Sequence, residues 1–138
     1  MSTLKVDTIQ NVAGGSASTP LQLEQGRAKA WVNFNGNTGV VGDSYNVSSV
    51  TVNGTADFTI NFTTAFANAN YTFSTHGRNA VSNTTFEVWG LGPSFSQTTS
   101  SIRLQNTGAD YAGTSAEANL ALAATALGTL CVVFFGDQ

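Results

Sequence analysis

Apolar and polar side chains alternate along much of the chain. Residues 57–62 place Phe58, Ile60 and Phe62 at every second position, and residues 28–35 alternate in the same way. Because successive side chains of a β-strand point to opposite faces, this period of two predicts strands with one buried face. Shorter runs repeat the pattern at Tyr71 and Phe73, at Phe86 and Val88, and at Ile102 and Leu104.

Turn-forming residues separate these runs. Asn53-Gly54 lies just before the run at residues 57–62, which is a strong signal for a β-hairpin. Both prolines, Pro20 and Pro93, lie between runs and not inside them. This spacing predicts an all-β fold, an antiparallel β-sandwich or jelly-roll-like domain over residues 28–138.

Two segments depart from simple alternation. Residues 116–127 are rich in helix-forming Ala and Leu, but Leu120 and Leu122 also alternate, and we interpret the segment as a strand or as a loop followed by a strand. Residues 130–135 are apolar on both faces. Such a run predicts a central strand, or one covered by a neighbouring subunit.

The first 27 residues form a segment of their own. Leu4, Val6 and Ile9 predict a short amphipathic strand, and residues 13–18 read as a flexible linker. Because an isolated strand is not stable alone, we expect it to pair with another subunit or with a docking partner. The first residues lack the apolar stretch of a secretory signal, and no run approaches the ~20 apolar residues that cross a bilayer. We therefore expect a soluble protein made in a cytosol.

The surface carries unusually few charges. Charged residues make up 9% of the chain, against about 25% in typical soluble domains. Hydroxyls and amides cover the surface instead, and they lose less than ions on leaving water, which favours large protein contacts. The net charge is −3 and the five basic residues are dispersed, so we expect neither nucleic-acid binding nor insertion into a membrane.

The residues needed for catalysis are sparse. The chain has one histidine, His76, and one cysteine, Cys131, and it contains neither a Gly-x-Ser-x-Gly elbow nor a phosphate-binding loop. Its eight acidic residues are scattered. We therefore expect no enzyme activity, no metal and no cofactor, with His76 exposed beyond a strand end and Cys131 acting as a small buried apolar residue.

Aromatic side chains are the candidates for a binding surface. Trp89, Phe95 and Tyr111 are expected at or beyond strand ends, where flat rings could stack on a sugar or contact another protein. The alternative is that they cap the core or fill a subunit interface. Trp31 alternates with Ala30 and Val32, which places it on the opposite face, in a contact with another subunit or a second sheet.

Several segments together resemble a known family. They are STLKVDTIQN at residues 2–11, AKAWVNFNG at 28–36, YNVSSVT at 45–51, NGT at 53–55, FTINFTTA at 58–65, ANY at 69–71 and VVFFGD at 132–137. In combination they resemble the tail-fibre-like virion appendage proteins of tailed bacteriophages, many of which infect marine and cyanobacterial hosts. Between residues 76 and 128 the resemblance is weak.

The resemblance implies a structural protein of a phage particle, made in the host cytoplasm and commonly trimeric. Its N-terminal segment would anchor it to other virion proteins of the tail or capsid, and its variable loops would meet a glycan or protein of the host surface. The family carries no catalytic residues to transfer. Two other readings stay open: a capsid decoration or head-fibre (knob) protein, and a free carbohydrate-binding module.

These expectations assign two sets of site residues. The anchoring and assembly set is Leu4, Val6, Ile9 and Trp31. The host-contact set lies between residues 76 and 128 and consists of His76, Arg78, Trp89, Phe95 and Tyr111.

Overall fold

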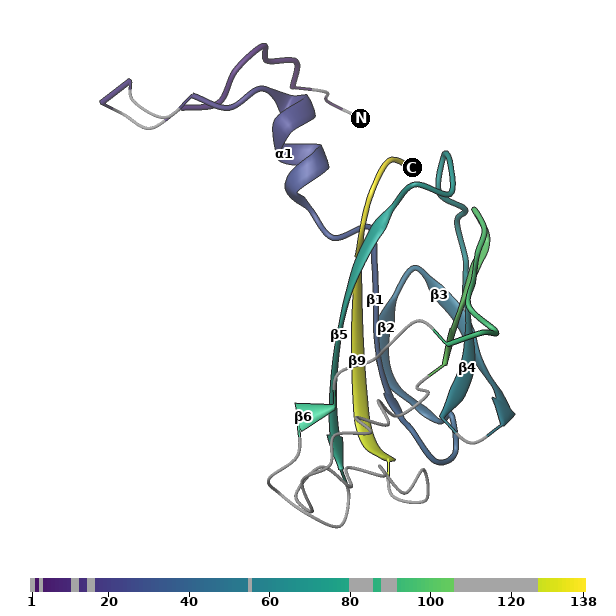
Figure 1. Ribbon diagram of the computed structural model, residues 1–138. Helices are drawn as coiled ribbons and strands as arrows, with labels where there is room; N and C mark the ends of the chain where they lie inside the picture. Colours follow the sequence, from purple (N-terminus) through teal and green to yellow (C-terminus); the bar gives the residue numbers. More distant parts are fainter. Residues whose placement is uncertain are drawn as a thin grey trace, which may run out of the picture.

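The computed structural model describes residues 2, 4–10, 13–14, 17–54, 56–79, 86–87, 92–105 and 127–138. Two antiparallel sheets pack face to face into a sandwich, and a short helix precedes them (Figure 1). The predicted all-β sandwich is therefore confirmed.

Five strands form the first sheet. Their order across the sheet is β2 (Val41–Tyr45), β1 (Ala30–Asn35), β9 (Leu127–Phe135), β5 (Thr72–Asn79) and β6 (Phe86–Glu87). Every neighbouring pair is antiparallel. The strand β9 lies between β1 and β5, so the apolar run at residues 130–135 is a central strand, as predicted.

Four strands form the second sheet. Their order is β3 (Val47–Gly54), β4 (Asp57–Phe62), β8 (Ser101–Gln105) and β7 (Ser96–Gln97). The predicted hairpin joins β3 to β4, with Val50 opposite Ile60. Its turn lies slightly further along the chain than the Asn53-Gly54 signal indicates, because Gly54 still belongs to β3 and Ala56 adopts the left-handed conformation with φ 55°.

The core lies between the two sheets and is formed by the alternating residues. The buried apolar side chains from the strands are Ala30, Val32, Phe34, Phe58, Ile60, Phe62, Ile102, Leu104, Leu130, Val132 and Phe134. Aromatic edge-to-face contacts join the sheets: the ring of Phe62 lies 5.0 Å from that of Phe134, and the ring of Phe34 lies 5.1 Å from that of Phe58. Pairs of this kind stabilise a core beyond their apolar area alone.

A single asparagine ties the corner where the chain passes from one sheet to the other. Asn46 lies between β2 and β3 with φ 55°. Its amide Nδ2 donates to the carbonyl oxygens of Lys29 and Thr64, each at 3.1 Å, and its Oδ1 accepts from the Thr64 amide at 2.7 Å. These bonds hold the start of β1 and the end of β4 against the same corner.

The N-terminal arm, residues 2–27, differs from the prediction. The structure describes residues 4–8, and they do not form a strand. Ile9 makes only an isolated bridge to Ser18. The predicted linker is followed by the helix α1 (Pro20–Gly26), which begins with a capping box between Thr19 and Gln22. Proline at the first helical position and a reciprocal cap are strong helix-start signals, and they account for the helix.

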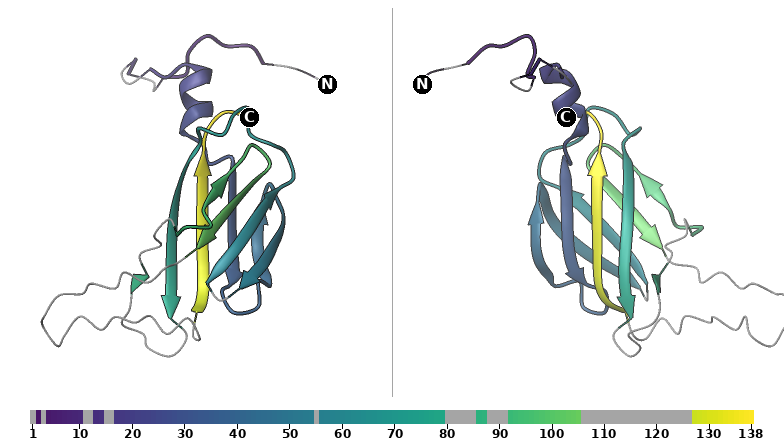
Figure 2. Two further views of the ribbon diagram at one scale, coloured as in Figure 1. Left: turned by 45° about the vertical axis from the view of Figure 1, so that its right-hand side comes forward. Right: turned by 90° about the vertical axis from the view of Figure 1, so that its left-hand side faces the viewer.

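The arm projects beyond one end of the sandwich (Figure 2). The helix α1 has no buried residue, and five large apolar side chains among the described residues of the arm are exposed. They are Leu4, Val6, Ile9, Leu21 and Leu23. Residues 116–126, which we interpreted as part of a strand or a loop, lie outside the described residues, and only Leu127 of that segment is seen, at the start of β9.

Close packing at the C-terminal end of β9 gives a test of the core. A Cβ atom on Gly136 would lie 2.6 Å from the Cβ of Tyr71 and 3.1 Å from a ring carbon of Phe66. Gly136→Ala should therefore lower the free energy of unfolding by roughly 1–3 kcal/mol, as overpacking does. Urea denaturation measures it. The matched control is Gly54→Ala, where the added Cβ meets no atom within 4 Å; equal losses in both variants would contradict the packing described.

Candidate interaction surfaces

The outer face of the four-stranded sheet is polar. Thr51 of β3 lies opposite Thr59 of β4, and Ser49 lies opposite Asn61. Directly opposed residues share a face of the sheet, and the Nδ2 of Asn61 donates to the Ser49 hydroxyl at 3.0 Å. This face is thus covered by short side chains that bond to one another across the strands.

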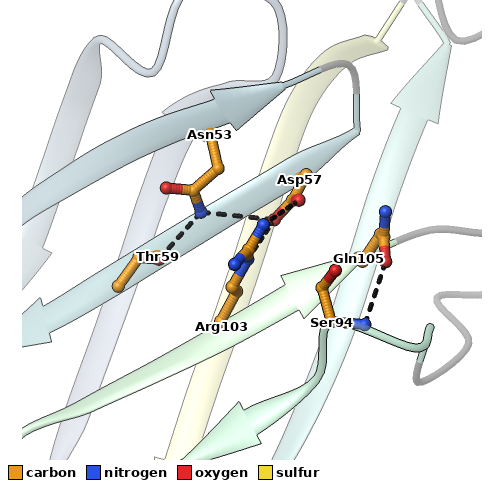
Figure 3. Close-up of polar contacts among 6 residues, drawn as sticks. All are labelled: Asn53, Asp57, Thr59, Ser94, Arg103 and Gln105. Atoms are coloured by element: carbon orange, nitrogen blue, oxygen red, sulfur yellow. Dashed lines mark hydrogen bonds and ion pairs between the residues drawn. The ribbon is translucent and has the colours of Figure 1, made fainter.

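One ion pair lies on this polar face. The Nε and Nη2 atoms of Arg103 donate to the two carboxylate oxygens of Asp57 at 2.8 and 2.6 Å (Figure 3). Asn53 Nδ2 also donates to Asp57 at 3.2 Å and to the Thr59 hydroxyl at 2.8 Å. The hydrogen bonds from Arg103 hold the pKa of Asp57 below its ordinary value. Because the cluster joins β3, β4 and β8, we interpret it as a structural contact.

The outer face of the five-stranded sheet is different in kind. One row across the strands contains Tyr45, Trp31, Val133 and Ser74, and the next row contains Asp43, Asn33, Cys131 and His76. Trp31, Cys131 and Val133 are half-buried, and Tyr45 is 53% exposed. Large apolar side chains therefore lie on a face that no other part of the described chain covers fully.

A shallow cavity of about 420 Å³ lies over the middle of this face. We call it the outer groove, and its outward side chains are Trp31, Asn33, Ser74, His76, Cys131 and Val133. They come from the three adjacent strands β1, β9 and β5. Apolar atoms dominate its surface.

The anchoring set is divided between the arm and the groove. Trp31 lies on the face opposite the core, as predicted, and forms part of the outer groove. Leu4, Val6 and Ile9 are exposed on the arm, with Leu4 86% exposed. Within one chain, none of these three side chains is buried against the sandwich.

The host-contact set is not brought together among the described residues. His76 lies within β5, and not beyond a strand end as expected; its exposed side chain lines the outer groove. Phe95 is half-buried, packs against the core and stacks on Phe73 with ring centroids 6.3 Å apart. Arg78 lies in β5, but its side chain is outside the described residues, as are Trp89 and Tyr111.

Cys131 also differs from expectation. We expected a buried side chain, but it is half-buried on the outer face, because β9 turns Leu130 and Val132 toward the core and Cys131 away from it. Sequence reasoning also missed Asn33, Ser74 and Val133 as groove residues. The alternation assigns each of them to an outward face, but only the strand register places them side by side.

The Asp57–Arg103 pair generates a pH-dependent prediction. A carboxyl whose pKa is lower in the folded chain than its unfolded value of about 4 stabilises the fold above that pH. The contribution is lost as the pH falls through the folded-state pKa. Asp57→Asn should therefore lower the free energy of unfolding by roughly 1–3 kcal/mol at pH 7, and the difference from wild type should shrink as the pH falls below the unfolded value of about 4.

Urea denaturation at several pH values checks this. The control is Asp43→Asn on the other sheet, where the exposed carboxylate of Asp43 accepts a hydrogen bond from the Ser44 amide at 2.8 Å. We expect little change from it, because the asparagine side chain keeps an oxygen that can accept this bond. A loss in Asp57→Asn that is as large at pH 2.5 as at pH 7 would show that the charge is not what stabilises this site.

Within the described residues, no three His, Cys, Asp or Glu side chains gather where they could hold a metal ion. Among the described residues, the helix α1 is too short and too polar to cross a membrane.

No protein-family model matches the chain, and no curated protein or solved structure is detectably similar to it.

Proposed function

We propose that the protein is a structural component of the virion of a tailed bacteriophage, a tail-fibre-like appendage that assembles as a homotrimer. It is made in the host cytoplasm and held in the particle through its N-terminal arm. The role requires no catalysis, metal or cofactor. The sequence resemblance suggests this identity, and the layout of the sandwich supports it.

The observation that carries the proposal is the separation of the two ends of the sandwich. The arm enters at Ala30, which pairs with Phe134 near the end of β9. At the other end of the same sheet, β5 ends at Asn79, which pairs with Leu127 at the start of β9. This end of β9 is the one further from α1 in Figure 1. The described residues that border the stretch 80–126, Asn79 before it and Leu127 after it, therefore lie at the end of the sheet away from the arm.

This layout suits an appendage. One end is attached through the arm, and Asn79 and Leu127, just inside the two limits of the proposed host-contact segment, lie at the other. Loops on a rigid scaffold carry recognition in many proteins, and residues 76–128, where the family resemblance is weak, hold the proposed host-contact set. The partner there would be a glycan or protein of the host surface.

The outer face of the five-stranded sheet supports the oligomer. Trp31, Tyr45 and Val133 form a continuous row on that face. A contiguous apolar patch on a soluble protein marks an interaction surface more often than isolated apolar residues do. The chain is also poor in charged residues, at 9%, so a large contact desolvates few ions.

The carbohydrate-binding alternative is less well supported. It needs exposed rings that share one face, and Phe95 instead stacks on Phe73 against the core. A ring held in this way offers little free surface for a sugar.

Removal of residues 1–12, with a new initiating methionine, should abolish incorporation into phage particles. The deleted part of the arm holds Leu4, Val6 and Ile9, and its described residues are all exposed, so the sandwich should keep its stability. Immunoblotting of purified particles measures incorporation, and thermal unfolding of the purified chain measures stability. Truncated protein present on particles in normal amounts would show that the arm is not the anchor.

Light scattering tests the oligomer directly. At micromolar concentration we expect the mass of three chains of 14.3 kDa each. Trp31→Ser, which removes the largest apolar side chain of the outer groove, should shift the mass toward a single chain. Val52→Ser, on the other sheet, should not. A wild-type mass of one chain would contradict the assembly.

A further inference from the structure

The arm carries apolar side chains that its own chain leaves in water. Leu4 is 86% exposed, Val6 40% and Ile9 51%. Residues 4–9 read Leu-Lys-Val-Asp-Thr-Ile. If they extend as a strand, Leu4 and Val6 point to one side, and Lys5 and Asp7 point to the other. Such a segment can bury its apolar side while its two opposite charges stay in solvent.

The outer groove offers a surface of matching chemistry. Trp31 and Val133 are direct neighbours across β1 and β9, and Cys131 lies beside them. Its volume of about 420 Å³ suits a few side chains and is too small for a whole domain. The groove and the arm therefore fit each other in both polarity and size.

The junction between arm and sandwich directs the arm away from its own groove. The Lys29 amide donates to the Phe134 carbonyl at 2.8 Å, and the Lys29 carbonyl accepts from Asn46 at 3.1 Å. The buried Lys29 side chain reaches back to Glu24 of α1 at 2.9 Å. These bonds fix the helix at the end of the sandwich, and both views in Figure 2 show the arm continuing beyond that end.

We propose that Leu4 and Val6 of one copy occupy the outer groove of a neighbouring copy. The inference rests on the homo-oligomer of the proposed function and names the surface that receives Leu4 and Val6. In an extended strand Ile9 would face the opposite side, so Ile9 and the exposed Leu21 and Leu23 of α1 stay available for contact with the particle. Each copy supplies one arm and accepts one. A head-to-tail exchange of this kind closes into a ring when the rotation between copies allows it, and a trimer is such a ring.

Disulfide trapping tests the contact in the purified full-length chain. Cys131 is the chain's only cysteine, and it lies in the groove, so Val6→Cys adds one possible partner. Copper phenanthroline takes two electrons from each pair of thiols that it joins. A disulfide forms only where the two Cα atoms come within about 7 Å. We expect links between residues 6 and 131 of different copies, found by peptide mapping, and covalent trimers on a non-reducing gel.

The matched control is Val52→Cys. Val52 is 41% exposed against 40% for Val6, but it lies on β3 of the other sheet. It should link to Cys131 no more than chance collisions allow. The wild-type chain, with a single thiol, can give at most dimers.

A second measurement does not depend on the new cysteine. In the oligomer, the arm should shield Cys131 from a maleimide. Val6→Ser should raise the labelling rate about tenfold, because losing one buried apolar side chain weakens a contact by about that factor. Val52→Ser should leave the rate unchanged.

Three results would overturn the inference. A link between residues 6 and 131 within one chain would place the arm in its own groove. An oligomer that lacks this link and whose Cys131 labels equally fast in wild type and in Val6→Ser would show that something other than the arm covers the face, and would leave the proposed function standing. A monomer at micromolar concentration would contradict both.

Discussion

The sandwich depends on the position of β9, whose backbone pairs with β1 on one side and β5 on the other. This strand is the last along the chain, and it joins the first strand to one that begins more than forty residues later, at Thr72. Its inner side chains, Leu130, Val132 and Phe134, fill the middle of the core. Without β9 the five-stranded sheet would separate into two pairs of strands, and strand pairs of that size are marginal in water.

The same strand also places apolar side chains on the outer face of the five-stranded sheet. Cys131 and Val133 turn outward beside Trp31, so the sheet is apolar on both sides at its centre. On the other sheet, Asn61 and Ser49 bond to each other, and Arg103 pairs with Asp57, so the outward side chains satisfy one another. The two outer faces therefore differ: the polar side chains of one bond to one another within a single copy, and the other leaves large apolar side chains only half-buried.

The sequence predicts the fold well where a short-range pattern determines the structure. Alternation identifies the inward side chains of β1, β4 and β8, and the double-faced run at residues 130–135 indicates a central strand. Register is a long-range property, so the sequence does not reveal that Asn33 of β1 and His76 of β5 border the same groove. The sequence predicts that His76 lies beyond a strand end, but pairing with β9 carries β5 on to Asn79. In the arm, the sequence analysis predicts a strand and a linker but not the helix α1, which the capping box of Thr19 and Gln22 begins.

The antiparallel pairing of β1 with β9 also decides how the domain would carry a load. Because Ala30 lies opposite Phe134, the arm and the C-terminal end of β9 leave from the same end of the sheet. Tension between these two points would peel β1 from β9 one hydrogen bond at a time. Tension between the arm and the far end of the sandwich would instead run along the strands, and the bonds that flank β1 would share it together. A domain attached through its arm and pulled from its far end is thus loaded along its strands, the direction in which a sheet resists shear. The hydrogen bond between Asn46 and Lys29 stabilises the start of β1, where this load would enter.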